Sequence, residues 1–377
     1  MKDRGKAEFF RGRQEQLEAF NKLVERAEKE KSGTIFLVQG APGVGKTAFL
    51  EECEEKMDKE TWDVIWCDPD VLWDVNQLRK SLRLGNQVQI AKSFIELGVE
   101  SLIKIGVYFK LADRTIIGSI NNRRKKRGLL LILDEIQDLG EKASPPDKVA
   151  ERRVRNTLYQ MHNWKMKKPF ILLVGGLGMS KSVLKQYGIS RFNRKCAFNL
   201  GALNKEAEKE IIKQYMTKKG GVHENNPNLH HWIHTIVTET QGWAHHITGY
   251  GIVLSEQLKE NQGVLNEKEL EQVLKKGEEE RFSYYEQRVE DIDIQKRKLI
   301  TSLLKKKIPE MSEDDMVSFF KKTFDYEKSK DLFDVALEKG VFHQNEDGAF
   351  VVPIPSMQTW MLHRFGRQGK DDDPTKN

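Results

Sequence analysis

The sequence has few of the features that mark secreted or membrane proteins. Its 377 residues include three cysteines, Cys53, Cys67 and Cys196, whose spacing fits neither a metal site nor a disulfide framework. An odd number of thiols suits a reducing compartment, so we expect a cytoplasmic protein. The N-terminal segment 1–13 is charged and lacks the apolar centre of a signal peptide.

Long apolar runs are also missing. The most membrane-like stretch, residues 101–120, is interrupted by two lysines, an aspartate and an arginine. It falls short of the roughly 20 apolar residues that a membrane-spanning helix needs. We therefore expect a soluble protein without a membrane partner.

Neither sign of charge is in large excess. The chain has 63 basic and 57 acidic residues, and its net charge of +6 is small for its length. Such a balance is weak evidence for nucleic-acid binding. With 38% apolar residues the chain can bury a real core, and its length predicts two or three domains.

The first half of the chain alternates between short apolar runs and helical segments. Continuous apolar runs separated by helices are typical of strands buried on both faces of a parallel sheet. The pattern therefore predicts an α/β nucleotide-binding domain over residues 1–200. Its predicted elements are an amphipathic helix at 13–31 and strands at 34–39, 63–67, 129–134, 170–176 and 196–200.

The second half is mostly helical. Residues 203–280 lack strand patterns and predict a helical lid domain over 201–285. Three helices are then expected, followed by a hairpin at Asp347-Gly348, and this order predicts a winged-helix-like domain over 286–366. The polar tail 367–377 is expected to be disordered. The three helices are expected at 292–306, 312–324 and 328–339.

A glycine-rich loop follows the first predicted strand. Its sequence GAPGVGKT fits the pattern G-x-x-x-x-G-K-[ST] in full. The glycines let the backbone approach phosphates at a helix N-terminus, while Lys46 would reach the β- and γ-phosphates and Thr47 would bind Mg²⁺. The alternative is a glycine-rich turn that matches by chance. The predicted nucleotide contacts are Gly40, Ala41, Pro42, Gly43, Val44, Gly45, Lys46, Thr47 and Ala48.

An acidic pair ends the third predicted strand, in the sequence LLLILDEIQDL. A buried strand that delivers acids at its C-terminal end would place Asp134 beside the metal ion. Glu135, the next residue, is the expected general base that polarises the attacking water. An ordinary acidic turn is the alternative, and we expect Asp138 to be a solvated residue.

These two motifs resemble those of P-loop ATPases of the AAA+ and STAND type. The resemblance implies ATP and Mg²⁺ as cofactors. It also implies that strand 170–176 is inserted in space between the strands of the two motifs. The segment FRGRQEQLEAF is similar to the start of initiator-like AAA+ and STAND ATPases, whose adenine packs near it. Phe10, Arg13 and Glu15 are therefore adenine-side candidates, and a plain helix start is the alternative.

The region after the fourth strand departs from the family pattern. In AAA+ proteins that strand usually ends in a polar residue that contacts the γ-phosphate, but here it ends in Gly175 and Gly176, and the first hydroxyl is Ser180. Arg191 lies where such families often place an arginine that reaches a neighbouring subunit's nucleotide. Arg194 is the substitute, and a surface arginine is the alternative for either residue.

Histidines provide weaker signals. His245 aligns with the sensor arginine of AAA+ members, but Ala244 breaks the glycine-proline pattern of STAND proteins, and a histidine packed between helices is the alternative. A second group lacks cysteine or acidic partners in any metal-binding pattern, so we expect it on the solvated surface. Its members are His223, His230, His231 and His234.

Two basic stretches, Arg123–Arg127 and Arg152–Arg155, are candidate partner surfaces. They could contact DNA or RNA phosphates or an acidic protein. A solvated loop and an amphipathic helix are the alternatives. The third helix of the winged-helix-like domain has nearly balanced charges, which favours an internal docking module over a reader of DNA bases.

Three functions are therefore open. The first is a AAA+/STAND-type regulatory ATPase that binds and hydrolyses ATP, with its nucleotide state controlling homo-oligomer assembly or a protein partner. The second is a DNA-binding initiator or transposition-regulator ATPase. The third is a nucleotide-gated adaptor that does not hydrolyse ATP.

Overall fold

The chain forms two compact units, which we call the core unit and the helical unit. The core unit comprises Arg13–Gln39 and Lys46–Phe198, and the helical unit comprises Ala7–Gly12, Gly40–Gly45 and the chain from Asn199 onward. The predicted boundaries at residues 200, 285 and 366 stay predictions. The computed structural model describes residues 7–31, 33–82, 120, 128–141, 148–163, 168–189, 194–305, 311–344 and 349–366.

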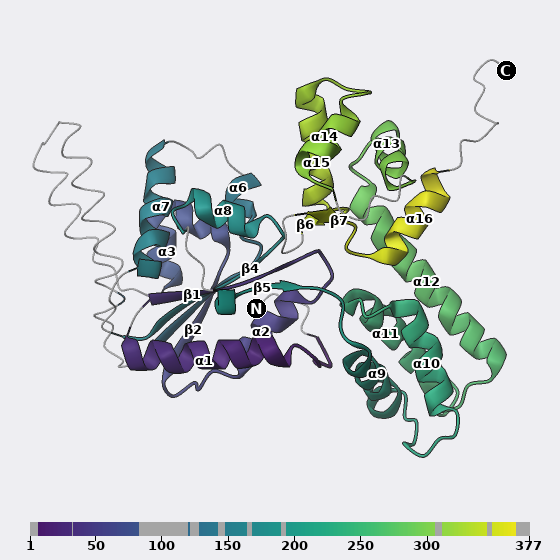
Figure 1. Cartoon of the computed structure of the whole chain (residues 1–377). Coiled ribbons are helices and arrows are strands. Elements are labelled where there is room, and N and C mark those ends of the chain that lie inside the picture. The colour runs from purple at the N-terminus through teal and green to yellow at the C-terminus, as the bar shows by residue number, and fades with distance from the viewer. Residues whose placement is uncertain are drawn as a thin grey trace, which may run out of the picture. The chain divides into compact units, whose positions relative to one another are not determined.

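A parallel sheet forms the centre of the core unit (Figure 1). Among the described residues its strand order is β2-β3-β4-β1-β5, and β4 pairs in parallel with both β1 and β3. The predicted α/β fold and the predicted insertion of β4 are thereby confirmed. The strands are β1 (Gly33–Gly40), β2 (Trp62–Cys67), β3 (Gly128–Leu133), β4 (Phe170–Gly176) and β5 (Ala197–Leu200).

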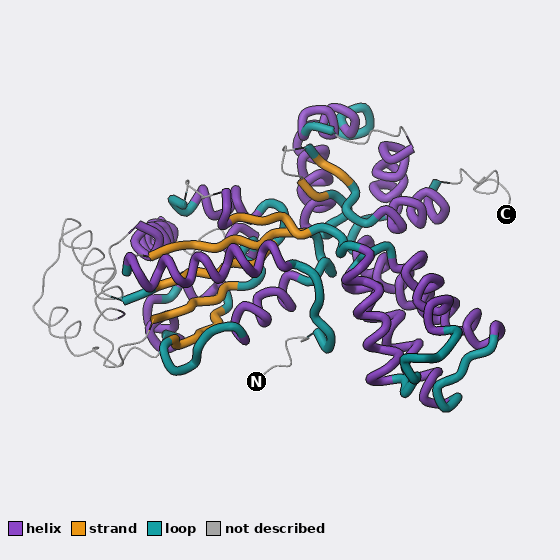
Figure 2. Tube along the Cα trace, turned by 60° about the horizontal axis from the view of Figure 1, so that its bottom comes forward, coloured by secondary structure: helices purple, strands orange, loops and turns teal. Residues whose placement is uncertain are grey.

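Helices cover both faces of this sheet (Figures 1 and 2). Successive side chains of a strand point to opposite faces, so each face of β1 has its own partners. Phe36 meets Phe20 of α1 with ring centroids 5.6 Å apart, whereas Leu37 packs in the cluster that contains Leu158 of α7. The helices of the core unit are α1 (Gln14–Glu30), α2 (Lys46–Glu55), α3 (Val75–Ser81), α6 (Asp138–Glu141), α7 (Lys148–Asn163) and α8 (Ser180–Gln186).

The helical unit begins with a group of helices that share one apolar core. Tyr215, Tyr250 and Leu254 are among its buried side chains. Asn204 caps α9 by accepting a hydrogen bond from the Ala207 N–H at 2.8 Å, which sets where that helix begins. The helices are α9 (Lys205–Gln214), continued by a π-helical turn (Tyr215–Lys219), then α10 (Leu229–Thr240), α11 (Ala244–Glu260) and α12 (Glu267–Val289).

The C-terminal part has the predicted order of three helices and a hairpin, and one more helix, α16, follows. Strands β6 and β7 pair antiparallel, while the predicted turn Asp347-Gly348 and the tail 367–377 lie outside the described residues. No helix within the described ranges is long and apolar enough to cross a membrane. The elements are α13 (Ile294–Lys305), α14 (Glu313–Phe320), α15 (Tyr326–Glu338), β6 (His343–Gln344), β7 (Phe350–Val351) and α16 (Pro355–Phe365).

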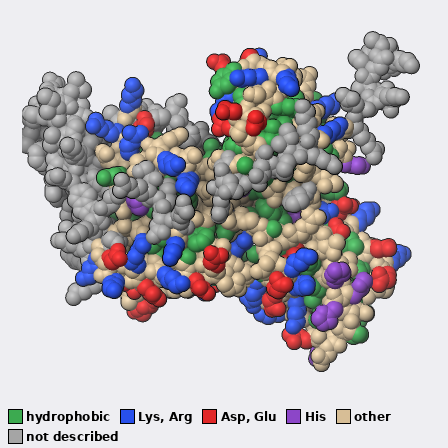
Figure 3. Space-filling model, in the orientation of Figure 1, with side chains coloured by type: hydrophobic (Ala, Val, Ile, Leu, Met, Phe, Trp, Pro, Cys, Tyr) green, Lys and Arg blue, Asp and Glu red, His purple; other side chains and the backbone are tan. Residues whose placement is uncertain are grey.

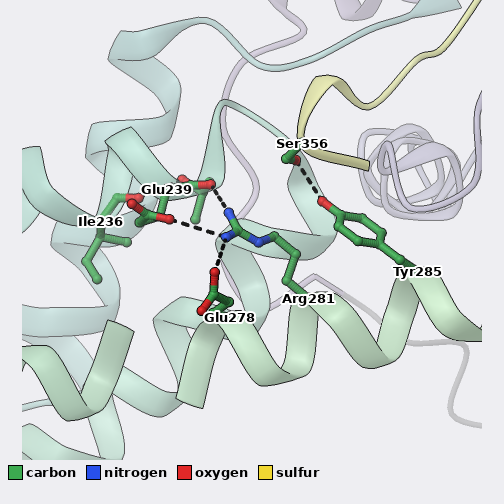
Figure 4. Close-up of polar contacts among 7 residues, drawn as sticks. Ile236, Glu239, Glu278, Arg281, Tyr285 and Ser356 are labelled. Atoms are coloured by element: carbon green, nitrogen blue, oxygen red, sulfur yellow. Dashed lines mark hydrogen bonds and ion pairs between the residues drawn. The ribbon is translucent and has the colours of Figure 1, made fainter. Parts of the chain in front are cut away.

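Helix α12 joins the two parts of the helical unit through neighbouring residues (Figure 4). The Arg281 guanidinium donates to the Glu239 carbonyl at the end of α10 (2.8 Å) and pairs with the carboxylates of Glu239 (3.3 Å) and Glu278 (3.4 Å). Four residues on, the Tyr285 hydroxyl shares a hydrogen bond with the Ser356 hydroxyl of α16 (2.7 Å). Helix α12 therefore bonds both to α10 in the first group of helices and to α16 in the C-terminal part.

We expect Arg281→Met to lower the free energy of unfolding by about 2 kcal/mol, because it removes charge-assisted hydrogen bonds from a side chain that is 8% exposed. The control is Arg364→Met, which removes an exposed pair with Glu286 at 3.4 Å and should cost less than about 1 kcal/mol. Urea unfolding measures both values. Equal losses in the two variants would contradict the role assigned to Arg281.

A buried carboxylate holds the turn between α10 and α11. Glu208 is 2% exposed, and its Oε1 accepts hydrogen bonds from the Thr240 hydroxyl (2.5 Å) and from the Gly242 N–H (2.6 Å). Burial raises the pKa of Glu208 above its ordinary value, and these two hydrogen bonds act in the opposite direction. The folded state therefore binds this proton more tightly than the unfolded chain does.

This difference makes stability depend on pH. Because the folded pKa is raised, the contribution of Glu208 is fully present below its ordinary pKa of 4.5 and is lost as the pH rises through the folded value. Glu208→Gln keeps the same acceptor oxygen without the charge, so the variant should gain stability relative to the wild type as the pH rises above 4.5. Urea unfolding across this range measures the difference, with exposed Glu271→Gln as the control. A difference that stays constant with pH would refute the assignment.

Candidate functional site

The glycine-rich loop lies between β1 and α2. Gly43 and Gly45 have φ angles of 74° and 96°, in the left-handed region that glycine adopts without a steric penalty. Lys46 begins α2 and is 5% exposed. A backbone of this kind at a helix N-terminus directs amide groups and positive charge toward a bound anion. These φ angles and the position before α2 suit the predicted binding of phosphate.

The two predicted metal ligands lie together in the core unit. The Thr47 hydroxyl donates a hydrogen bond to Asp134 Oδ2 at 2.7 Å, although 87 residues separate them in the chain. Burial raises the pKa of Asp134, and the hydrogen bond from Thr47 acts against this shift. A hydroxyl and a carboxylate are oxygen ligands that suit Mg²⁺, which keeps few protein ligands beside waters and nucleotide phosphates.

Glu135 follows Asp134 in an unusual conformation. Its φ of 53° lies in the left-handed region, and its N–H donates to Asp134 Oδ1 at 3.0 Å. The side chain is exposed. Its Oε2 accepts a hydrogen bond from the Gln137 side-chain amide at 2.5 Å. The acidic pair therefore includes one carboxylate turned toward Thr47 and one at the surface.

Within the helical unit, the loop Gly40–Gly45 accepts two hydrogen bonds. The Tyr284 hydroxyl donates to the Pro42 carbonyl at 2.7 Å, and the His245 N–H donates to the Gly43 carbonyl at 3.0 Å. The His245 ring stacks on Tyr284 with centroids 4.1 Å apart, and burial lowers the pKa of His245. The ring is thus packed and biased toward its neutral form, in line with a histidine that packs between helices.

Of the adenine-side candidates, Phe10 and Arg13 lie just before α1, and Glu15 lies in its first turn. Arg13 precedes the helix with φ 66°, and burial lowers the pKa of its guanidinium to about 10. Phe10 is half-buried and Glu15 is exposed. Their assignment to adenine stays a prediction.

Several predicted residues fall outside the described part of the chain. Arg191 is one of them, and so is the basic stretch Arg123–Arg127. Arg194 begins a short 3-10 turn, Arg194–Cys196. Of the second basic stretch, Arg152 is exposed and Arg155 donates to the Gln186 carbonyl at 2.9 Å. The arginine-finger assignment is thus untested.

Exposed histidines gather on one face of the helical unit (Figure 3). They come from α10 and the segment before it, as the sequence predicts for a solvated surface. Within the described residues, no group of three or more histidine, cysteine, aspartate or glutamate side chains could hold a metal ion. The histidines are His223, His230, His231 and His234.

The sequence did not single out Gln137 or Tyr284. Gln137 donates a hydrogen bond to Glu135, two residues before it in the chain. The glycine pair 175–176 is the sequence signal that could have pointed to it, because the lack of side chains there leaves room for Asp134 and Gln137 at the end of β4. Tyr284 carries no motif, because its contact with Pro42 joins residues 242 positions apart.

The chain is similar to known proteins in part of its sequence and in its fold. Residues 10–145 match the family model of the AAA ATPase domain. The fold is similar to the ORC2 protein of Aeropyrum pernix, solved as ADPNP-ADP complexes, with a TM-score of 0.52 and 12% identity over 95% of each chain. It is also similar to a Walker-type ATPase of Pyrococcus abyssi, with a TM-score of 0.54 and 12% identity over 94% of this chain and 97% of that chain. No curated protein matches the sequence.

Both motifs, the loop 40–47 and the acid pair 134–135, lie inside the matched segment. The position of β4 between β1 and β3 agrees with the strand order that the resemblance implied. At 12% identity the likeness to the solved structures concerns the fold alone. Residues 10–145 of the chain thus resemble an AAA ATPase domain, and the fold as a whole is similar to that of the Aeropyrum pernix ORC2 protein and of the Pyrococcus abyssi Walker-type ATPase.

Proposed function

We propose that this protein binds ATP with Mg²⁺ and hydrolyses it. The observation that carries the proposal is the 2.7 Å hydrogen bond between Thr47 and Asp134. It brings together the two oxygen ligands that a nucleotide-bound Mg²⁺ needs, from two separate motifs. If the glycine-rich turn and the acidic turn matched the two motifs by chance, nothing would require Thr47 and Asp134 to lie within hydrogen-bond distance.

Each residue of the site has a stated role in this proposal. The loop 40–45 and Lys46 bind the phosphates, Thr47 and Asp134 hold the metal ion, and Glu135 orients and activates the attacking water. When bound, Mg²⁺ neutralises charge on the phosphoryl oxygens. Arg13 is proposed on the adenine side, and Arg191 as the arginine that reaches a neighbouring subunit's nucleotide.

We further propose that the nucleotide state controls homo-oligomer assembly or a protein partner. The hydrogen bonds from Tyr284 and His245 to the loop 40–45 support this, because a loop that changes on binding phosphate would act on α11 and α12. Helix α12 also bonds to α16, which connects such a change to the C-terminal helices. The three free, buried cysteines agree with a cytoplasmic setting.

A DNA-binding initiator or transposition-regulator ATPase is the second candidate. The exposed Arg152 on α7 favours it, because a phosphate contact needs an accessible cation. Arg155, by contrast, is 3.8 Å from Glu151 and bonds to a backbone carbonyl, which reduces the charge available to a partner.

ATPase rate and oligomeric mass, each measured with and without duplex DNA, test these proposals together. Turnover that requires Mg²⁺ and a mass that changes with ATP would support the first. DNA binding by the wild type that weakens steeply with salt would support the second. The salt dependence should then become less steep in a variant in which the basic residues of 123–127 are neutralised. ATP binding without turnover under every condition would leave the nucleotide-gated adaptor. A protein that binds no ATP would refute all three.

A further inference from the structure

Two glycines end β4 next to the acidic pair. A side chain at Gly175 would begin 2.5 Å from Asp134 Oδ1, and one at Gly176 would begin 2.8 Å from Gln137 Oε1 and 2.2 Å from Ser180 Oγ. The strand continues through both residues, so they are needed for space. Side chains from other elements, Asp134 and Gln137 after β3 and Ser180 of α8, fill the end of this strand.

Both ends of the Gln137 side-chain amide are bonded. Its Oε1 accepts a hydrogen bond from the Leu177 N–H at 3.1 Å, and its Nε2 donates to Glu135 Oε2 at 2.5 Å. A backbone N–H can only donate, so the amide oxygen must face Leu177 and the amino group must face Glu135. Gln137 is also 5% exposed, which prevents the amide from rotating freely.

The main chain at Glu135 is also held in place by hydrogen bonds. A left-handed φ in a non-glycine residue costs roughly 1–2 kcal/mol and persists only where the surroundings impose it. Here the Ile136 N–H donates to the Gly175 carbonyl and the Asp138 N–H donates to the Glu135 carbonyl, each at 3.0 Å. The backbone direction is therefore set by β4, while the exposed carboxylate of Glu135 depends on Gln137 for its orientation.

We propose that Gln137 is a positioning residue that connects the end of β4 to Glu135 and holds the Glu135 carboxylate where it can activate water. The inference rests on the proposed hydrolysis of ATP. A general base must lie within about 2.6–3.2 Å of the group that it deprotonates, and an unrestrained glutamate samples many rotamers. Loss of Gln137 should therefore lower turnover without weakening nucleotide binding.

Two substitutions separate the two hydrogen bonds. Gln137→Met removes both at similar volume, and Gln137→Glu keeps an acceptor for Leu177 while it loses the donor to Glu135. We expect both to lower kcat for Mg²⁺·ATP by about tenfold or more, with the Kd of a non-hydrolysable ATP analogue within about twofold of wild type. Added to Glu135→Gln, Gln137→Met should reduce the residual rate by less than about twofold.

The matched control is Gln214, a buried glutamine of the helical unit that is 4% exposed and donates to Glu210 at 2.9 Å. Gln214→Met should leave kcat unchanged. If Gln137→Met does not fold, Gln137→Glu decides the question alone.

The failures can be told apart. Wild-type kcat in Gln137→Glu would overturn the positioning role and leave the proposed ATP hydrolysis intact. A parallel change in Kd and kcat would also overturn it, because a residue that acts only through Glu135 does not alter affinity. A wild-type protein that binds ATP without turnover would refute the proposed hydrolysis, and this inference with it.

Discussion

Glu135→Gln is expected to bind ATP as tightly as the wild type and to lose turnover by at least about a hundredfold. Glutamine has nearly the shape of glutamate but cannot accept the proton of the attacking water, and general-base catalysis contributes about 10²–10⁴ to the rate. The side-chain amide introduced at position 135 keeps an oxygen that can accept the hydrogen bond from Gln137. Single-turnover hydrolysis and equilibrium ATP binding measure the two quantities separately.

Asp138→Asn is the control for this change. It removes a carboxylate three residues further along the same segment, which the proposed chemistry does not use, and should leave the rate within about twofold. Unchanged turnover in Glu135→Gln would refute the assigned base. A joint loss of binding and turnover would instead assign Glu135 to the binding of nucleotide or metal.

Lys46→Ala is expected to weaken ATP binding by about a hundredfold or more. The ammonium group at the start of α2 would pair with the β- and γ-phosphates, and charge-assisted hydrogen bonds of this kind are worth about 1.5–3 kcal/mol each. At about 1.4 kcal/mol for each tenfold change, two such bonds account for the expected loss. Isothermal titration with an ATP analogue in the presence of Mg²⁺ measures the affinity.

The control is Lys56→Ala, at a lysine that follows the same helix and pairs with Glu52 at 3.3 Å on the surface. Its affinity for the analogue should match that of the wild type, because a surface pair of this kind contributes little. Normal affinity in Lys46→Ala would discredit the loop as a phosphate site, whatever the motif suggests.

Sequence patterns located the strands well. Each of the five predicted apolar runs is a strand within one residue at either end, for example 129–134 against Gly128–Leu133. β3 and β4 are buried at every position, so their apolar runs are unbroken, whereas β2 and β5 are only partly buried and include Asp63 and Asn199. The insertion of β4 came from the family resemblance and not from the pattern, and the sheet order confirms it.

Helix ends were harder to place. The predicted helix 312–324 ends at Phe320, because the following residues form hydrogen-bonded turns such as the bond from the Thr323 N–H to the Phe320 carbonyl. The predicted helix 328–339 begins at Tyr326, because Asp325 caps it by accepting from the Lys328 N–H at 2.8 Å. Such ends depend on single local hydrogen bonds, which periodicity does not report.

The sequence by itself determined the α/β fold class and the two motifs of the candidate nucleotide site. The loop 40–47, the acids 134–135 and the apolar strands before them depend on residue types at fixed short spacing, which can be recognised without coordinates. Only the tertiary structure decided that Thr47 meets Asp134 and that Gln137 ties Leu177 to Glu135. The Thr47 and Leu177 contacts join residues 87 and 40 positions apart, and which such residues meet is set by the order of the strands and the packing over them. The spacing of residues along the chain does not predict that arrangement.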